Sequence, residues 1–456
     1  MTYRWIRELK ATAVLTLPLM IGHLSHMGMG FTDTLMAGRL SALDLAAVAL
    51  ANSIWLPLWL FVLGLMLGIS PTVAQWFGAK QWCEIGVFFR QALWLAIFLG
   101  VILHVTLQEA HVFLVWFGVD SSLWEITADY LYALSWGAPF TALWLVGRLT
   151  SEGMGHTRVI MYVQLAALCI NALADYVFMF GAWGMPAYGA VGAGWSTTVV
   201  MLFSALVYFL YLCRSQRYQR YGLFEKFDWP DWRVLFSQLR LNIPIGVAVV
   251  MEASLFGGVA LLMGGLGTVP LAAHQIAVNY VSMMFMIPMS LGSALTARIG
   301  QAVGAGQFNK ARYIGMLGMF SGALLMTFSG LIMVFFPEVI VSVYTRDAIV
   351  TELAVSLLFF AALFQIWDGV QVCAAGALRG LKDTAIPGLI TVVAYWGVGF
   401  PCAWFLGLQH GMGPEGLWMG LLAGLFLASI LLSLRFYRVT RYNAAVVDKR
   451  LEVSRG

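Results

Sequence analysis

The chain has 456 residues, of which 61% are hydrophobic and only 11% are charged. Soluble globular proteins are about 45–50% apolar and about 25% charged, so this composition excludes a water-soluble fold, and the lack of a long polar tract excludes disorder. The net charge of +4, from 26 Lys and Arg against 22 Asp and Glu, indicates membrane topology rather than nucleic-acid binding.

Long apolar runs predict helices that cross a membrane. A bilayer core about 30 Å thick requires roughly 20 residues of helix, and only helices or closed barrels satisfy backbone polar groups in lipid. The runs are continuous rather than alternating, which favours helices over a barrel. In chain order, twelve spans are predicted at 13–36, 46–70, 88–108, 126–147, 159–181, 190–213, 241–264, 275–297, 313–336, 350–377, 385–408 and 415–437.

The positions of the basic residues test this count of twelve. If both termini are cytoplasmic, 24 of the 26 Lys and Arg residues fall on the cytoplasmic side, and only Arg39 and Arg346 fall on the outer side. This bias satisfies the positive-inside rule. The sequence therefore predicts an all-α, multi-pass membrane protein with cytoplasmic N- and C-termini and with no Lys or Arg in the middle of a span.

The two halves of the chain resemble each other. Pro18 and Pro244, like Gln75 and Gln301, are separated by the same offset of 226 residues. Six spans per copy is an even number, so the copies share one orientation, and rocking of two pseudo-symmetric lobes would give alternating access. We expect an N-terminal six-helix lobe, a cytoplasmic linker, a C-terminal six-helix lobe and a cytoplasmic tail at 1–213, 214–240, 241–437 and 438–456.

Four carboxylates lie inside predicted spans, and they are Asp33, Asp175, Glu252 and Asp368. A charged side chain at the centre of a bilayer costs about 2.5–3.5 kcal/mol even on a lenient scale. An acid that caps or hydrogen-bonds a neighbouring helix could explain one such residue. Four of them favour sites that hold protons or coordinate a cation.

Depth in the membrane divides these acids into two groups. Glu252 and Asp368 both lie near the midplane, so they could share one site in the C-terminal lobe. Asp33 and Asp175 are nearer the outer ends of their spans. Polar side chains at a similar depth complete a set of oxygen ligands suited to a hard monovalent cation or a proton relay, and they belong to Asn171 and Thr197.

Other residues give weaker signals. The pair His23 and His26 is explained better by packing than by a transition-metal site, and five scattered cysteines indicate neither disulfides nor zinc. Capping is the commoner role for Gln275 at the start of a span, although this side chain could reach an acid. The run of Met and aromatic residues around position 285 is explained equally by packing and by binding of organic cations. The candidate contacts for substrate or cation are Gln275, Tyr280, Phe285 and Phe364.

Five segments together resemble the multidrug and toxic compound extrusion (MATE) family of transporters, in its NorM branch. The resemblance extends over essentially the whole chain, and the five segments are specific only in combination. They are GFTDTLMAG (30–38), PTVAQWFGA (71–79), MEASLF (251–256), AAHQIA (272–277) and WDGVQVCAAGALRG (367–380).

The resemblance implies a monomeric antiporter of the bacterial inner membrane, not an enzyme, with a role in antibiotic resistance. It would export cationic, often aromatic drugs and dyes in exchange for Na⁺ or H⁺, with no other cofactor. The family acid on the first span falls on Asp33, and the NorM acids on the seventh and tenth spans fall on Glu252 and Asp368. The family's N-terminal cation cluster falls on Asn171, Asp175 and Thr197 together with Asp33.

The chain departs from the NorM pattern in two places. Close NorM relatives carry Asn at the position of Asp175, which leaves open which lobe binds the coupling ion. A tyrosine hydroxyl near the C-terminal acids of some relatives is replaced by phenylalanine, at Phe285 or Phe364. We therefore expect cation coordination in the C-terminal lobe to lack one ligand.

Three other functions stay open at this point. The main alternative is a related flippase for lipid-linked or other amphipathic cargo, but polyanionic cargo favours Arg or Lys in the cavity, whereas the charge inside the predicted spans is acidic. An intramembrane aspartyl protease is disfavoured because the sequence has no GxGD. A channel is compatible with the buried acids, but the duplicated lobes favour a carrier.

Overall fold

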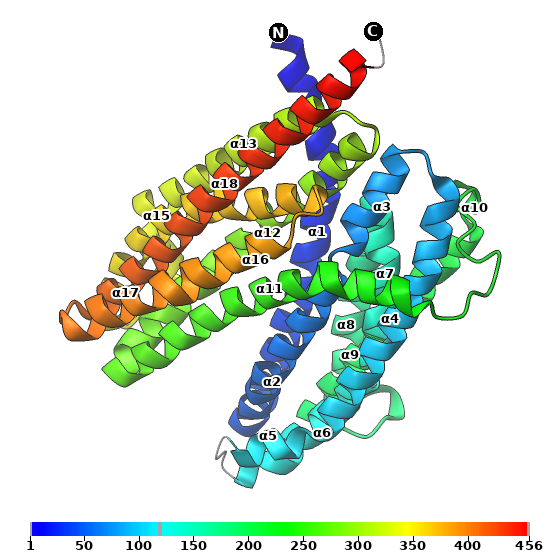
Figure 1. Ribbon diagram of the computed structural model, residues 1–456. Helices are drawn as coiled ribbons and strands as arrows, with labels where there is room; N and C mark the ends of the chain where they lie inside the picture. The colour runs from blue at the N-terminus through cyan, green and yellow to red at the C-terminus, as the bar shows by residue number, and fades with distance from the viewer. Residues whose placement is uncertain (1, 117–120, 454–456) are drawn as a thin grey trace. The chain divides into compact units, whose positions relative to one another are not determined.

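The computed structural model describes residues 2–116 and 121–453, in which the chain forms helices and no strand, so the all-α prediction is confirmed. Figure 1 shows long helices joined mostly by short connections. Among the described residues, eleven helices are long and apolar enough to cross a membrane. They are α1 (Thr2–Leu40), α2 and α3 (Ala42–Met66 and Ile69–Gly78), α4 (Trp82–Gln108), α8 (Arg158–Phe180), α9 (Ala190–Arg214), α11 (Trp232–Leu266), α12 (Thr268–Gly304), α13 (Phe308–Phe335), α15 (Ala348–Gly380), the run of α16, η2, α17 and η3 (Ala385–Val392, Val393–Gly399, Phe400–Trp404 and Phe405–Gln409), and α18 (Gly413–Val453).

The predicted span at 126–147 is divided into α6 (Ser121–Ser135) and α7 (Ala138–Gly153). Pro139 lies in the first turn of α7 and has no N–H, so it cannot donate the helical hydrogen bond to the carbonyl of Ser135. Nδ1 of His104 lies 3.0 Å from that carbonyl oxygen and donates in its place. A side chain of α4 therefore stabilises the break, and neither half has the length of a span.

The chain is divided into two compact units. The N-terminal unit comprises Ile21–Asn242, and the C-terminal unit comprises Met1–Met20 together with Ile243–Gly456. This division differs from the predicted lobes, because the first 20 residues belong with the second half and the predicted linker belongs with the first. Of the predicted tail at 438–456, residues 454–456 lie outside the described part, and α18 extends through the rest.

A buried ion pair joins the start of α1 to the C-terminal unit. The guanidinium of Arg298 on α12 donates to the carboxylate of Glu8, to the Glu8 carbonyl oxygen at 2.8 Å and to the hydroxyl of Thr12. The side chains of Glu8 and Arg298 are 6% and 10% exposed. Because a buried charge is stable only when it is paired and hydrogen-bonded, this contact explains why α1 begins in the C-terminal unit.

The predicted linker is a packed segment of the N-terminal unit. Nε of Arg90 on α4 donates to the carboxylate of Asp228 at 2.6 Å, and its Nη1 donates to the carbonyl of Gly222 at 2.6 Å. The side chain of Gln91 donates to the carbonyl of Trp229 at 2.9 Å. The linker therefore packs against α4. It contains the short helix α10 (Gln216–Gln219).

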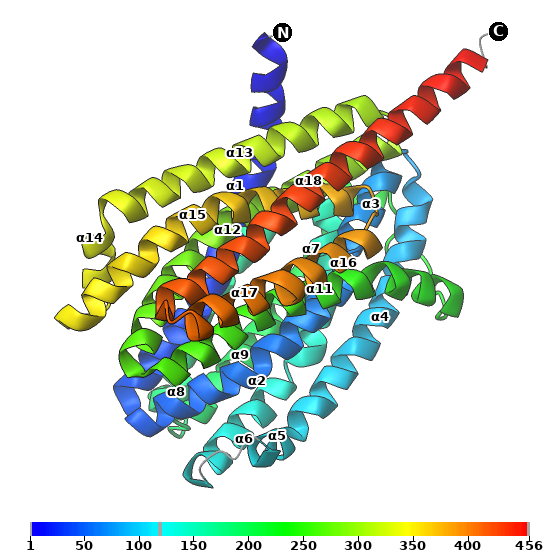
Figure 2. The same ribbon diagram turned by 60° about the vertical axis from the view of Figure 1, so that its left-hand side comes forward.

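Within the C-terminal unit, α12 and α15 lie side by side, as Figures 1 and 2 both show. A Cβ atom on Gly376 would lie 2.4 Å from the carbonyl oxygen of Gly292, so only glycine permits this close approach. The segments η2 and η3 are π-helical. Short π-helical segments inside α-helices are rare and occur frequently at functional sites.

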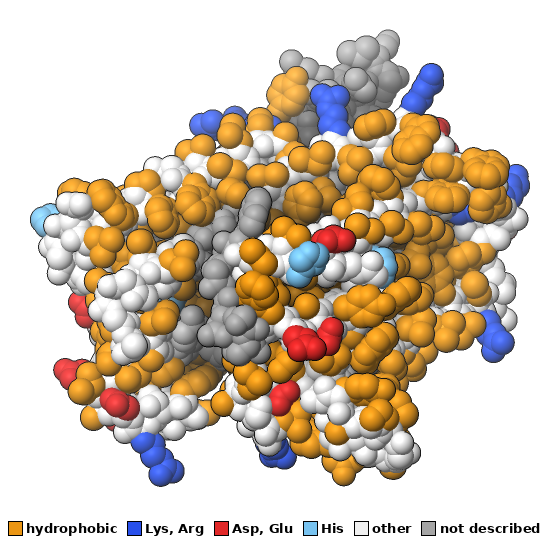
Figure 3. All heavy atoms as spheres, turned by 90° about the horizontal axis from the view of Figure 1, so that it is seen from below, with side chains coloured by type: hydrophobic (Ala, Val, Ile, Leu, Met, Phe, Trp, Pro, Cys, Tyr) orange, Lys and Arg blue, Asp and Glu red, His pale blue; other side chains and the backbone are white. Residues whose placement is uncertain are grey.

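The outer faces of several helices are apolar. On α13, Phe320, Leu324 and Phe328 follow one another at a spacing of four residues and are 61–67% exposed. Hydrophobic side chains are also widespread over the described part of the face shown in Figure 3. Such stripes are expected where a helix contacts lipid instead of water, so they support a multi-pass membrane protein. The remaining short helices are α5 (Ala110–Trp116), η1 (Ala182–Gly184) and α14 (Pro337–Ser342).

Candidate functional site

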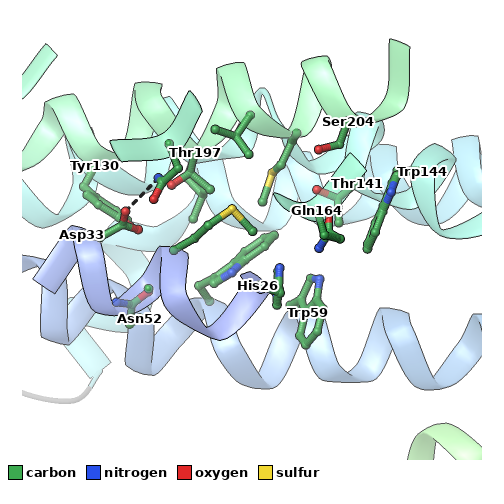
Figure 4. A pocket seen from close by; sticks show the side chains of 17 residues that line it. His26, Asp33, Asn52, Trp59, Tyr130, Thr141, Trp144, Gln164, Thr197 and Ser204 are labelled. Carbon is green, nitrogen blue, oxygen red and sulfur yellow. Dashed lines mark hydrogen bonds between the residues drawn. The ribbon is translucent and has the colours of Figure 1, made fainter. Parts of the chain in front are cut away.

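A cavity of about 130 Å³ lies inside the N-terminal unit, lined by residues of α1, α2, α6, α7, α8 and α9. Asp33, Tyr130 and Asn52 lie toward one end, as Figure 4 shows. Toward the other end lie Trp59 and Trp144. Asp33 is the only Asp, Glu, Lys or Arg among the described lining residues, so the cavity combines one acidic end with an aromatic region.

Helices far apart in the sequence position the carboxylate of Asp33. Nδ2 of Asn171 on α8 donates to Oδ1 of Asp33 on α1 at 3.0 Å. The same amide nitrogen lies 3.5 Å from the hydroxyl of Ser196 on α9, and Ser196 donates to the Asn171 carbonyl at 3.3 Å. The depth count that grouped Asp33 with Asn171 did not determine whether their helices touch, and the structure brings the two side chains into direct contact.

Asp175 is fully buried beside this hydrogen bond. Its carboxyl lies within electrostatic range of that of Asp33. In the part of the chain that the structure describes, neither oxygen of Asp175 accepts a hydrogen bond. Two adjoining carboxylates away from water repel each other unless a proton or a cation lies between them. A proton or a cation between the two groups would relieve this repulsion.

Two further oxygens belong to this part of the cavity. Thr197 lines it, as the depth count suggested, while its hydroxyl donates to the carbonyl of Ala193 at 2.9 Å. The hydroxyl of Tyr130 on α6 is a group that the sequence reasoning missed. Its ring is 1% exposed, and it lies within electrostatic range of both Asp33 and Asp175. Tyr130 is near the outer end of its predicted span, so the depth count used for the acids would have found it.

Aromatic side chains form the other part of the cavity. The ring of His26 stacks on Trp59, with centroids 5.3 Å apart and planes inclined at 23°. Trp55 and Trp144 line the same space. Aromatic faces attract organic cations and planar rings, and the negative charge of Asp33 lies within the same cavity.

A basic side chain is buried in this unit, just beyond the end of the predicted span at 126–147. Arg148 lies on α7 and is 6% exposed, because α7 continues to Gly153 and neighbouring helices cover its face. The guanidinium donates to Nε2 of His23 and lies over the ring of Trp144 at 5.2 Å. The negative charge of Glu152 lies within electrostatic range. Arg148 thus has partners of its own and does not line the cavity.

In the C-terminal unit, Glu252 on α11 and Asp368 on α15 lie within electrostatic range of each other. Asp368 is 2% exposed, and its Oδ2 accepts no hydrogen bond among the described residues. The charge of Arg379, near the end of α15, acts on Glu252. The two acids that were grouped by depth near the midplane therefore act on each other electrostatically.

The other predicted contacts are dispersed over this unit. Gln275 is exposed on α12, while Tyr280 and Phe285 are half-buried on the same helix. Phe364 is 1% exposed and packs edge-on against Phe256 and Trp418, with ring centroids 5.8 Å and 6.2 Å away. Phe364 is thus part of the hydrophobic core, and a role for these four residues in binding stays a prediction.

The site of Glu252 and Asp368 has a hydroxyl that the sequence reasoning missed. Tyr395, on η2, is fully buried and lies within electrostatic range of both carboxyls. The sequence reasoning expected a missing ligand because phenylalanine stands at Phe285 or Phe364 in place of a tyrosine of some relatives. Those two residues lie on other helices than Tyr395. A depth count would have pointed to Tyr395, because it lies about as far into its predicted span as the two acids do into theirs.

Comparison with known proteins agrees with this architecture. The MatE family profile matches residues 18–177 and again residues 244–405, once in each half. The chain is 40% identical over 441 residues to the probable multidrug resistance protein NorM of Xanthomonas campestris pv. campestris, with 96% of each chain covered. It is also 40% identical over 439 residues to the multidrug resistance protein PmpM of Pseudomonas aeruginosa, covering 95% of this chain and 92% of that protein.

Solved structures share the fold. The crystal structure of the eukaryotic MATE transporter AtDTX14 matches with a TM-score of 0.86 and 21% identity, covering 97% of this chain and 99% of that one. The outward-facing structure of a multidrug resistance MATE family transporter of the MOP superfamily matches with a TM-score of 0.88 and 19% identity, covering 96% and 97%. The prediction of a twelve-helix fold of this kind is confirmed.

Proposed function

Because the chain belongs to the multidrug and toxic compound extrusion family of transporters, we propose that it exports organic cations across the bacterial inner membrane in exchange for Na⁺ or H⁺. In this proposal both termini are cytoplasmic, and the substrates are cationic, often aromatic drugs and dyes. The relatives named as multidrug resistance proteins support a drug-exporting role.

The observation that carries the proposal is the cavity of the N-terminal unit. It places the carboxylate of Asp33 in one chamber with the stacked rings of His26 and Trp59. A planar organic cation would contact aromatic faces and pair its charge with the acid. The hydrogen bond from Asn171 holds the carboxylate in place for this contact.

Coupling would arise from competition for negative charge. Asp33 and Asp175 in one unit, and Glu252 and Asp368 in the other, form pairs of acids that a proton or Na⁺ would stabilise. If the ion and the drug cation bind best to opposite conformations, entry of the ion from outside weakens the hold on the drug. Release of the ion to the cytoplasm then restores the drug-binding state.

The flippase alternative is less well supported. A polyanionic headgroup would need basic side chains in the cavity. Among the described lining residues there is no Lys or Arg, and Asp33 is the acidic one. The buried Arg148 is already engaged with His23 and Trp144. A cavity of this polarity fits a cation better than an anion.

The test is ethidium export from proteoliposomes under an imposed Na⁺ gradient at symmetric pH, and separately under a pH gradient without Na⁺. We expect at least one gradient to drive uphill export. Asp33→Asn and Asp368→Asn should each reduce it at least about tenfold, which corresponds to about 1.4 kcal/mol. The controls are Asp129→Asn and Glu352→Gln, which neutralise exposed acids on α6 and α15.

Two results would contradict the proposal. Downhill ethidium flux that ignores both gradients would indicate a channel. Wild-type export by both Asp33→Asn and Asp368→Asn would remove the acids from the mechanism.

A further inference from the structure

The π-helical segment η2 lies against α11 at the level of Glu252. Nε1 of Trp396 lies 3.2 Å from the carbonyl oxygen of Met251 and 3.2 Å from the hydroxyl of Ser254. These two acceptors flank Glu252 in the sequence. The indole of Trp396 therefore fixes the position of η2 along α11, the helix that carries Glu252. Tyr395 precedes Trp396 in the chain, so it lies at about the same depth as Glu252.

The ring of Tyr395 is enclosed by the C-terminal unit. The residue is 0% exposed and belongs to the same hydrophobic core as Leu255 and Phe364. On another side α18 approaches closely, because a Cβ atom on Gly424 would lie 3.5 Å from Cδ1 of Tyr395. The ring thus has little freedom to move, and its position is determined by packing.

The hydroxyl of Tyr395 ends in this core without a protein hydrogen bond among the described residues. Leaving a buried hydroxyl without a partner costs about 1–3 kcal/mol. The charged groups that act on it electrostatically are the carboxyls of Glu252 and Asp368, and Oδ2 of Asp368 likewise accepts no hydrogen bond. Two buried oxygens on η2 and α15, the hydroxyl of Tyr395 and Oδ2 of Asp368, therefore have bonding capacity unused, and Glu252 on α11 lies within electrostatic range of both residues.

We propose that the hydroxyl of Tyr395 is the third oxygen ligand of a monovalent-cation site formed with Glu252 and Asp368. This inference rests on the ion coupling in the proposed function. A phenol can donate its proton to one carboxylate oxygen while its lone pair faces the cation. It therefore adds a ligand without adding charge, so one bound cation does not have to offset a third negative group.

The test uses Tyr395→Phe, which removes one oxygen atom and keeps the packed ring. The matched control is Tyr208→Phe, because Tyr208 is also fully buried and its hydroxyl has no hydrogen bond among the described residues, but it belongs to the other unit. Ethidium export by both variants and the wild type is measured in proteoliposomes against external Na⁺ at symmetric pH, and against external pH without Na⁺.

We expect Tyr395→Phe to raise the concentration of the driving ion at half-maximal export about tenfold, the effect of losing one contact to a charged group. The ethidium concentration at half-maximal export should stay within about twofold, and Tyr208→Phe should match the wild type in both. The stabilisation of the purified protein by the driving ion, measured as the rise in Tm, should shrink in Tyr395→Phe alone.

An unchanged ion dependence in Tyr395→Phe, with an unchanged ion-induced rise in Tm, would overturn the inference while leaving the proposed function intact. A wild-type protein that responds to neither gradient would overturn the proposed function itself, and this inference with it. A loss of ethidium affinity with unchanged ion dependence would assign Tyr395 to the drug instead and would also overturn the inference.

Discussion

Nδ2 of Asn171 donates a 3.0 Å hydrogen bond to Oδ1 of Asp33, and this bond joins α8 to the acid that lines the cavity of the N-terminal unit. The two residues are 138 positions apart in the sequence. The bond occupies one oxygen of Asp33 and orients the carboxyl group.

Replacement of Asn171 by leucine should impair export without unfolding the protein. The change removes a donor to a buried carboxylate, and hydrogen bonds to charged groups contribute about 1.5–3 kcal/mol. We expect ion-driven ethidium export to fall about tenfold or more at wild-type expression. Asn309→Leu is the control, since Asn309 is exposed on α13 and does not line the cavity. Wild-type export by Asn171→Leu would show that the bond has no role in transport.

Neutralisation of Glu8 should destabilise the C-terminal unit. Glu8→Gln leaves the guanidinium of Arg298 buried without its carboxylate, and removal of one partner of a buried pair costs about 3–5 kcal/mol. We expect a clearly lower Tm for the purified variant in detergent. The double variant Glu8→Leu with Arg298→Leu should recover part of that loss, because apolar replacement of both partners avoids an unpaired charge. A Tm equal to that of the wild type in Glu8→Gln would contradict the assignment.

Loss of Arg90 should release the segment that connects the two halves. Its guanidinium bonds Asp228 and the carbonyl of Gly222, and Arg90 and Asp228 have side chains 11% and 30% exposed. Cleavage by a protease requires local opening of the chain. We expect chymotrypsin to cut Arg90→Ala about five to ten times faster after Phe227, as mass spectrometry of the fragments would show.

The control for this cleavage is Arg233→Ala, in which the exposed side chain removed has no ion pair among the described residues. Equal cleavage rates in Arg90→Ala and in the wild type would mean that the segment is held by other contacts.

His156 should make the stability of the N-terminal unit dependent on pH. Burial, together with the charges of Arg217 and Arg220, lowers the pKa of His156 below its ordinary value of 6.5. Below about pH 6.5 the unfolded chain therefore binds a proton that the folded chain binds less readily, so the stability decreases as the pH falls. Above pH 6.5 both states are neutral at this site and the effect disappears.

The measurement is the Tm of the purified protein at pH 7.5 and pH 5.5. The wild type should lose more of its Tm between these values than His156→Gln, which cannot acquire the charge. The ring of Tyr218 packs edge-on against His156 at 5.4 Å, so a modest loss of Tm at both pH values is expected in the variant. An identical loss of Tm on acidification in the two proteins would refute the role of His156.

Some features followed from the sequence because the bilayer acts on each helix separately. The lengths of the apolar runs, the cost of Asp33 or Asp368 in lipid and the distribution of Lys and Arg depend on position along one helix. The repeated pattern in the two halves appears again in the family profile, which matches residues 18–177 and 244–405. The burial of Arg148, just beyond a predicted span, did not follow in this way, because a residue near a helix end can be covered by neighbouring helices.

The sequence by itself determined that this protein is an all-α membrane protein of two related halves with four acids inside its spans, since length and hydropathy are local properties. Only the tertiary structure decided that Asn171 bonds Asp33, that Tyr130 and Tyr395 join the acids, and that α1 begins in the C-terminal unit. These relationships depend on how helices distant in the chain rotate and pack against one another. A periodic pattern along one helix contains no information about which side chain of another helix it meets.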